Sequence, residues 1–121
     1  MTTTLKIGVV GPCSAGKTTL VQGLKQRGYR NVRPIVQEHS YVPYMWQRIT
    51  NPDVLIYLDV SYENAQKRRC LNWTPEEYVE QLRRLQHARQ HAHLSVDTNS
   101  LSVDGVLEEA VRFLEDYLLS K

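Results

Sequence analysis

The sequence predicts an α/β fold: a three-layer domain with a mostly parallel sheet of about four strands and helices on both faces. Two observations predict it. Four apolar runs rich in β-branched residues alternate with segments of helical periodicity, which is the order typical of parallel sheets. The 121 residues contain no internal repeat or linker and can bury one modest core, so residues 1–121 are expected to form a single domain.

The four strands are expected at 5–10, 31–36, 54–60 and 93–98, which read LKIGVV, NVRPIV, VLIYLDV and HLSVDT. The run at 54–60 is the most continuously apolar, so we expect it at the centre of the sheet. Pro34 lies in the second run and cannot donate a ladder hydrogen bond, which indicates an edge strand.

Helical patterns follow the first and third strands. Leu20, Val21 and Leu24 recur at helical spacing after the first strand, and Gly28 supplies a stop. After the third strand, Ser61 is a suitable N-cap for a short helix over residues 62–70.

Two longer helices are predicted in the second half of the chain. Thr74-Pro75-Glu76-Glu77 combines an N-cap Thr, Pro at the first helical position and Glu three residues after the cap. The apolar stripe of this helix comprises Tyr78, Leu82, Leu85 and Ala92, and Glu80 and Arg84 form an outward i,i+4 pair. Ser102 opens the last helix, whose apolar face comprises Val106, Leu107, Ala110, Val111, Leu114 and Leu118.

The stretch GPCSAGKTTL, residues 11–20, lies between the first strand and its helix and matches Gly-x-x-x-x-Gly-Lys-Thr, the P-loop pattern. Gly11 and Gly16 allow backbone N–H groups to approach phosphate oxygens, and the following helix adds free N–H groups. Lys17 is placed to reach the β and γ phosphates, and the Thr18 hydroxyl to bind Mg²⁺. A turn that binds nothing does not need Lys and Thr together here, so we expect a phosphate site.

The predicted phosphate-binding residues are Gly11, Pro12, Cys13, Ser14, Ala15, Gly16, Lys17, Thr18 and Thr19. Two interpretations stay open for Cys13, which is either an oxidisable thiol or a small residue at a variable position.

Composition limits the other function classes. The net charge is +2 with 23% charged residues, which argues against coating nucleic acid or an acidic membrane as the main role. Cys13 and Cys70 lack metal-ligand spacing, and so do the four histidines. With no secretory signal and no long apolar span, a cytoplasmic location is expected.

Ligands of open parallel sheets bind beyond the carboxyl ends of the strands. The residues expected there are the P-loop, Gln37-Glu38-His39 after the second strand, Asp59 at the third, and Asp97 to Asn99 after the fourth. Several polar and acidic groups should therefore meet at one edge of the sheet.

On these residues, nearly the whole chain resembles the small P-loop kinases, which are nucleoside and nucleotide kinases with shikimate-type kinases as cousins. GVVGPCSAGKTTL matches their phosphate loop. PDVLIYLDVSYENAQKRR is similar to the strand and helix that lead into an arginine-bearing lid. LRRLQHARQHAHLSVDTNSLSVDGVLEEAVRFL resembles their ending, where an adenine-wrapping loop follows a strand that closes in Asp-Thr.

The resemblance implies a P-loop NTPase-like fold, ATP and Mg²⁺ as ligands, and adenine contacts from Thr98, Asn99 and Ser100. ATP is favoured over GTP because no Asn-Lys-x-Asp stretch occurs. The chain also departs from the family. Only HSYVPYMWQRITN stands where these kinases carry a substrate-binding segment and a further strand, and LNWTP is too short for a full lid.

Four charged residues are candidates for chemistry. Glu38 is a general base, a substrate anchor or a holder of Mg²⁺ through water, or else an exposed loop residue. Arg68 and Arg69 either neutralise the transferring phosphate or complement a helix dipole. Asp59 either binds Mg²⁺ or caps the next helix, which is the role implied by the resemblance of the chain to the small P-loop kinases.

For six other side chains, a structural role is an alternative to a role in binding. Tyr41, Tyr44 and Trp46 either stack on a base or acceptor, or cover the core where a strand is missing. Arg83, Arg84 and Arg89 share a helix and are expected mostly on its solvated face.

Two function hypotheses follow. The first is a minimal ATP-dependent phosphotransferase acting on a small hydroxylated or phosphorylated molecule, with Lys17, Glu38, Arg68 and Arg69 as catalytic residues. The second is an NTP-binding or slowly hydrolysing module whose nucleotide state controls a protein partner. The kinase-like ending and Glu38 favour the first hypothesis, and the short acceptor region and lid favour the second.

Overall fold

The computed structural model describes residues 5–69 and 74–120, except for the side chain of Arg69. Residues 1–4, 70–73 and 121 are outside this description, and with them Cys70 and most of the short LNWTP segment. The elements in chain order are β1 (Ile7–Val10), α1 (Lys17–Gln26), β2 (Val32–Pro34), the 3₁₀ helix η1 (Gln37–His39), α2 (Met45–Ile49), β3 (Val54–Asp59), α3 (Tyr62–Arg69), α4 (Pro75–His91), β4 (Leu94–Asp97) and α5 (Val103–Leu119).

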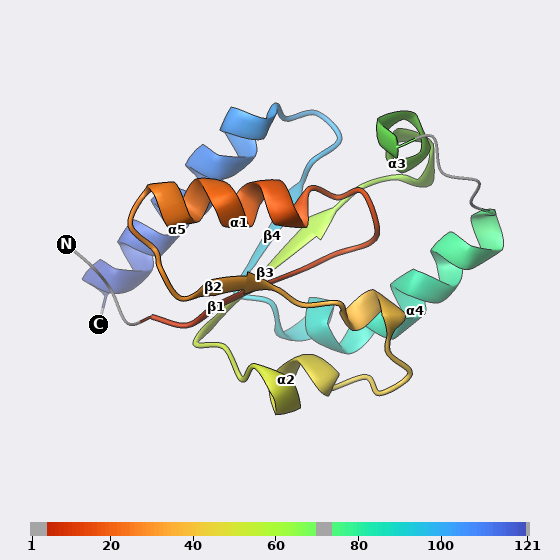
Figure 1. Cartoon of the computed structure of the whole chain (residues 1–121), viewed down its shortest axis with the longest axis horizontal. Coiled ribbons are helices and arrows are strands. Elements are labelled where there is room, and N and C mark those ends of the chain that lie inside the picture. Colours follow the sequence, from red (N-terminus) through yellow and green to blue (C-terminus); the bar gives the residue numbers. More distant parts are fainter. Residues whose placement is uncertain (1–4, 70–73, 121) are drawn as a thin grey trace.

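The four predicted strands form one sheet in the order β2-β1-β3-β4, and every pair is parallel. In Figure 1, α1 and α5 lie on one side of the sheet and α2 and α4 on the other. The expected three-layer α/β arrangement is therefore confirmed. β2 is an edge strand, as Pro34 indicates, and β3 lies in the interior of the sheet between β1 and β4.

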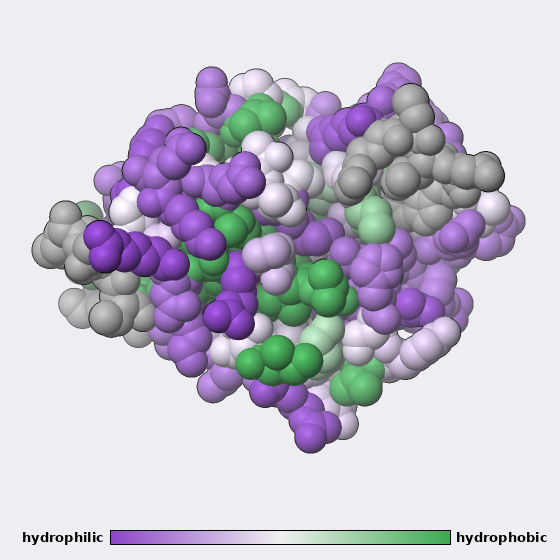
Figure 2. Space-filling model, viewed as in Figure 1, coloured by the Kyte–Doolittle hydropathy of each residue, from purple (hydrophilic) through white to green (hydrophobic). Residues whose placement is uncertain are grey.

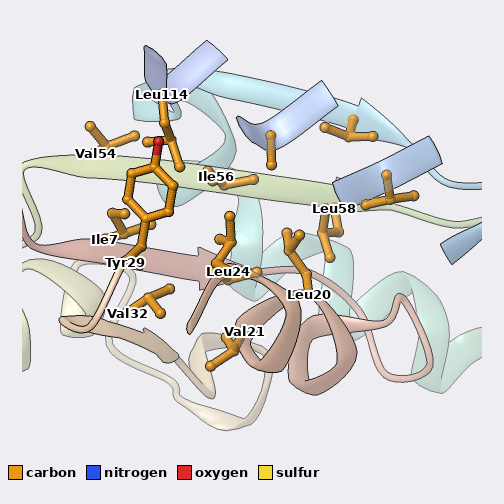
Figure 3. Close-up of a cluster of buried hydrophobic side chains, with 14 of the residues drawn as sticks. Ile7, Leu20, Val21, Leu24, Tyr29, Val32, Val54, Ile56, Leu58 and Leu114 are labelled. Carbon is orange, nitrogen blue, oxygen red and sulfur yellow. The ribbon is translucent and has the colours of Figure 1, made fainter. Parts of the chain in front are cut away.

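One face of the sheet packs against α1 and α5. Because side chains alternate along a strand, Ile7 and Val9 of β1 and Ile56 and Leu58 of β3 share this face. Figure 3 shows Leu20 and Leu24 of α1 pointing toward Ile56 and Leu58, while Leu114 of α5 comes from the other helix. All of these side chains are at most 3% exposed. Both elements that flank the predicted P-loop, β1 before it and α1 after it, are therefore anchored in a core that excludes solvent.

The opposite face carries a smaller cluster. Val10, Leu55 and Tyr57 point to this side, and helices α2 and α4 cover them through Trp46 and Leu85. The predicted stripe of α4 is only partly right, because its buried positions are Gln81, Leu85 and Ala88. Tyr78, Leu82 and Ala92 are half-buried.

The helix starts and stops agree with the local sequence. The capping box of α4 is formed: Glu77 N donates to Thr74 Oγ1 at 3.1 Å and Thr74 N donates to Glu77 Oε1 at 3.2 Å. Asn64 N donates to Ser61 Oγ, and Gly105 N donates to Ser102 Oγ. Helix α1 ends at Gln26, shortly before Gly28, which has a φ of 100°.

Several expectations need correction. All four strands are shorter than expected, and the short helices η1 and α2 were not predicted. Leu118 is 36% exposed rather than buried, because the 17-residue α5 is much longer than the four-residue β4 and its last turn extends past the sheet. Within the described ranges, no helix is long and apolar enough to cross a membrane.

Candidate functional site

The loop of residues 11–16 connects β1 to α1 at the carboxyl edge of the sheet. A Cβ at Gly11 would collide with the carbonyl oxygen of Leu58, so the loop can approach β3 this closely only with glycine. Gly16 has a φ of 97°, in the left-handed region that favours glycine, and is the N-cap of α1 without any side-chain cap.

This geometry leaves N–H groups at the start of α1 without a helical partner. The hydrogen bond from Leu20 N to Gly16 O, 3.0 Å long, is the first of the helix, so the amides of residues 17–19 precede it. Uncapped amides at a helix N-terminus, together with the helix dipole, attract anions. Thr18 and Thr19 are exposed beside these amides.

Lys17 lies across the loop and contacts Glu38. Its Nζ donates to the carbonyl oxygens of Gly11 at 2.6 Å and Pro12 at 3.0 Å, and lies 2.9 Å from Glu38 Oε2. The Lys17 and Glu38 side chains are only 11% and 4% exposed. The alternative of an exposed loop residue is therefore wrong for Glu38, which is buried and paired with Lys17.

Gln37 fixes Glu38 in this position. Its side chain is fully buried, donates to Val42 O at 2.8 Å and Arg84 O at 3.2 Å, and accepts from Trp46 N at 2.9 Å. These bonds join η1 to α2 and α4, and the tight turn of η1 then directs Glu38 toward Lys17. Glu38 Oε1 is buried and has no hydrogen-bond partner among the described residues.

Cys13 and His39 lie next to this pair. Gln81 of α4 accepts from Cys13 N at 3.0 Å and donates from Nε2 to Cys13 Sγ at 3.2 Å. His39 Nε2 is 3.7 Å from Cys13 Sγ and 3.8 Å from Glu38 Oε2. One ligand atom from each of Cys13, Glu38 and His39 lies within 4.8 Å of the others, although the sequence spacing of cysteines and histidines indicated no such cluster.

Arg68 connects the loop to the segment after β4. Its guanidinium donates to Ser14 O and Thr98 Oγ1, both at 3.1 Å, and to Thr98 O at 2.6 Å. Thr98 is buried, and its hydroxyl donates to Asp59 O at 2.8 Å. Arg68 thus points toward the loop and does more than complement the end of α3. The side chain of the other candidate, Arg69, is outside the described part.

Asn99 and Ser100 follow Thr98 in the segment expected to contact adenine. Asn99 Oδ1 accepts from Ser61 N at 2.9 Å and Asn64 Nδ2 at 2.8 Å, so its side chain holds the start of α3. Ser100 is exposed. Neither residue lines the cleft described below.

A cleft of about 820 Å³ opens at this edge of the sheet. Ten predicted residues line it: Cys13, Ser14, Ala15, Gly16, Lys17, Thr18, Thr19, Glu38, Arg68 and Thr98. Its far wall is apolar and comes from α1, α5 and the loop before α5, with Leu20, Leu101, Val103, Val106 and Leu107. The cleft therefore combines a polar end at the loop with an apolar end along two helices, which is the usual make-up of a small-molecule site.

Asp59 is not brought into this cleft. Its Oδ2 lies 3.6 Å from Arg89 Nη2 of α4, on the α2–α4 side. Burial raises the pKa of the neighbouring Tyr57 far above its ordinary value, and the Asp59 carboxylate raises it further. The Asp59 carboxylate thus lies beside tyrosines and an arginine of the packed face, and not beside the loop.

The aromatic residues of the interval between β2 and β3 divide into two kinds. Trp46 is 5% exposed, packs in the α2–α4 cluster and donates from Nε1 to His87 Nδ1 at 3.1 Å. Tyr41 and Tyr44 are 83% and 46% exposed, and the Arg84 guanidinium lies 4.2 Å from the centre of the Tyr41 ring. Of the two interpretations, covering the core is right for Trp46, and no residue from 40 to 52 lines the cleft.

Sequence reasoning placed Gln37 and His39 at this edge of the sheet without giving either a role, and it missed Gln81. Glutamine has no motif of its own, and the two glutamines matter here because they are buried and hydrogen-bonded on several sides.

Compared with models of known protein families and with curated protein sequences, the chain matches none.

Proposed function

We propose that this chain is a P-loop nucleotide-binding protein that takes ATP with Mg²⁺ at residues 11–19 and acts as a minimal kinase-like phosphotransferase. The observation that carries the proposal is the buried Lys17–Glu38 pair beside the uncapped start of α1. A lysine held at the entrance of a row of free amides suits a phosphate chain, because it supplies the charge that the amides cannot.

The loop side of the site supports binding of the phosphates. A triphosphate would accept from the amides of residues 17–19, and Lys17 would exchange its carbonyl partners for phosphate oxygens. Mg²⁺ takes oxygen ligands and keeps several waters, which fits the exposed Thr18 hydroxyl with Glu38 nearby. The pairing of Asp59 with Arg89 favours Glu38 over Asp59 as the carboxylate that assists the metal.

The carboxylate supports transfer as well as binding. Glu38 Oε1 is buried and unpartnered in the described part of the chain, so it is available to accept a proton from an acceptor hydroxyl. Arg68, bonded to Ser14 O and Thr98, is near enough to the loop to turn toward a transferring phosphate. The apolar wall from α1 and α5 suits the base of the nucleotide, by resemblance to the small P-loop kinases.

One observation favours the second hypothesis, a nucleotide-controlled module. The interval 40–52, from which an acceptor floor was expected, contributes nothing to the cleft. It instead exposes Tyr41, Val42, Tyr44 and Ile49, which are between 40% and 83% exposed. In Figure 2, apolar surface is visible in the region where α2 lies in Figure 1. A protein partner would bury these side chains.

Glu38→Gln separates the two hypotheses. With Mg-ATP and a panel of nucleosides, nucleotides and small alcohols, ADP release in the presence of an active acceptor should fall roughly a hundredfold or more in this variant. ATP affinity should stay nearly the same, because Lys17 loses a competing anion while Mg²⁺ loses an assisting carboxylate. Glu80→Gln, a change in a carboxylate on α4 that pairs with Arg83 and Arg84, should behave as the wild type.

The module hypothesis predicts a different result. No acceptor would then raise ADP release above the water background, and Glu38→Gln would match the wild type in any slow loss of ATP. That pair of results would contradict the phosphotransferase proposal while leaving nucleotide binding intact.

A further inference from the structure

The cluster of Cys13, Glu38 and His39 contains three different kinds of metal ligand, brought together from the loop and from η1. The Sγ–Nε2 distance is 3.7 Å and the Nε2–Oε2 distance is 3.8 Å. Zn²⁺ binds cysteine sulfur at about 2.3 Å and histidine nitrogen at about 2.1 Å, so two such ligands on a tetrahedral ion lie roughly 3.5 Å apart. The ligand atoms of Cys13 and His39 already have nearly this spacing, and the Oε2 distance places the Glu38 carboxylate beside them.

A second observation points to a ligand at the same place. Glu38 is 4% exposed, and its Oε1 is buried without a hydrogen-bond partner among the described residues. Leaving a buried carboxylate oxygen unsatisfied costs free energy. A cation beside Glu38 would satisfy this oxygen while Lys17 keeps its contact with Oε2.

We propose that, in the nucleotide-free chain, Cys13 Sγ, Glu38 and His39 Nε2 form a binding site for a thiophilic divalent cation such as Zn²⁺, at a time when Glu38 assists neither Mg²⁺ nor an acceptor hydroxyl. The donor set selects the class of metal, since sulfur and imidazole suit Zn²⁺ whereas Mg²⁺ prefers oxygen ligands. Three protein ligands leave a fourth position of a tetrahedral ion open toward the cleft for water.

The surroundings support such a site. Gln81 bonds both the backbone N and the Sγ of Cys13, and outer partners of this kind hold a ligand in position. His39 is 57% exposed, which gives the ion a path from solvent. Zn²⁺ brings two positive charges to the Lys17–Glu38 pair, and the Cys13 thiolate cancels one of them, so the occupied site with Lys17 carries one net positive charge.

Binding changes the protonation of one group. The Cys13 S–H bond breaks as the sulfur–zinc bond forms, and the proton passes to the buffer, without oxidation or reduction. The bound ion would tie the P-loop to η1 at the polar end of the cleft.

The test is calorimetric titration of the reduced, nucleotide-free full chain with Zn²⁺ alone, and with Co²⁺ in parallel for its absorption spectrum. One metal ion should bind per chain, with a near-ultraviolet band from thiolate to cobalt. Since even outer partners of a metal ligand contribute roughly 10–100-fold to affinity, Cys13→Ser and His39→Gln should each weaken Zn²⁺ binding at least roughly tenfold. Circular dichroism checks that both variants fold as the wild type does.

Two control variants remove the same kinds of side chain, a thiol and an imidazole, at positions outside the cluster. Cys70→Ser removes the other thiol, and His91→Gln removes one ring of the tilted His87–His91 pair, whose centroids are 4.3 Å apart. Both controls should bind Zn²⁺ as tightly as the wild type and keep the cobalt band. Wild-type affinity in Cys13→Ser, a band that depends on Cys70, or a loss in His91→Gln equal to that in His39→Gln would each overturn the proposal. No nucleotide is present, so these outcomes are independent of the proposed ATP site.

Discussion

On the α1–α5 face of the sheet the buried side chains form a continuous apolar layer, whereas on the α2–α4 face the layer is thinner and polar groups are mixed into it. The second face holds buried Gln37 and Gln81, and the Tyr57 hydroxyl there has no partner in the described part of the chain. The first face supports the loop and Lys17 through close packing. The second face holds Glu38 and Cys13 through hydrogen bonds.

The difference shows how the two halves of one site are positioned by different forces. Packing of Leu20 and Leu24 against β3 sets the direction of α1, and with it the amides at its start. The position of Glu38 depends instead on the three hydrogen bonds of Gln37. Substitutions on the two faces should therefore have effects of different size on the free energy of unfolding, and they should disturb different parts of the site.

Truncation of a core leucine on each face gives the largest expected effects. Leu24→Ala on the α1–α5 face should lower the free energy of unfolding by about 3–5 kcal/mol. Leu85→Ala on the other face, equally buried, should lower it by about 2–3 kcal/mol, because a thin layer relaxes more easily around the cavity. Urea denaturation of both variants measures the difference. Equal losses, or a larger loss for Leu85→Ala, would contradict the claim that the two faces are packed differently.

Gln37→Leu removes the hydrogen bonds that hold η1 to α2 and α4. The buried Trp46 N–H loses its acceptor, so the variant should be destabilised by about 2 kcal/mol. Hydrogen exchange should increase first at α2 and η1, while α1 keeps its protection. Gln47→Leu is the matched control, because Gln47 is an exposed residue of α2. If both glutamine variants have the same stability, hydrogen bonding does not position this side of the site.

Tyr57→Phe should change stability the least of these variants, and it should not destabilise the protein as the others do. The hydroxyl is buried and has no partner among the described residues, so its removal should leave stability unchanged or raise it by up to about 1 kcal/mol. Thermal unfolding at neutral pH checks this, with Tyr41→Phe as an exposed control. A clear loss of stability in Tyr57→Phe would show that the hydroxyl has a partner in solution.

The same residue predicts a pH dependence. Burial raises the pKa of Tyr57 above the ordinary value of 10.0, and the Asp59 carboxylate adds to the rise. Above pH 10 the unfolded chain therefore releases this proton before the folded chain does, and stability should fall as the pH rises further. Tyr57→Phe should lose less stability than the wild type in this alkaline range. Parallel curves for the two proteins would contradict the burial of the hydroxyl.

Much of the α1–α5 half of the molecule could be predicted from the sequence. The strand at 5–10, the glycines at 11 and 16 and the spacing of Leu20, Val21 and Leu24 are local signals, and they agree with one another. The convergence of Glu38 on the loop also followed from the parallel sheet, because the carboxyl ends of β1 and β2 meet at one edge.

The α2–α4 half was less predictable for physical reasons. The helices η1 and α2 are three and five residues long, too short for a periodic pattern. Gln37 and Gln81 are polar in sequence but buried, since their partners come from residues distant along the chain. The placement of Asp59 depends on Arg89 of α4, and no local pattern carries that pairing.

The central claim is that residues 11–19 bind the phosphates of a nucleotide with Lys17. Calorimetric titration with Mg-ATP tests it most directly. Lys25→Ala is the control, because Lys25 is an exposed lysine at the other end of α1. Since Lys17→Ala alone leaves Glu38 buried without its cation, the double variant Lys17→Ala with Glu38→Gln is measured beside it.

Both Lys17 variants should bind Mg-ATP roughly tenfold or more weakly than the wild type, because a hydrogen bond to a charged group is worth about 1.5–3 kcal/mol. Lys25→Ala should keep the wild-type affinity. Measurable binding by the wild type that stays equally tight in folded Lys17→Ala and in the double variant would contradict the phosphate site, and so would an absence of Mg-ATP binding by the wild type.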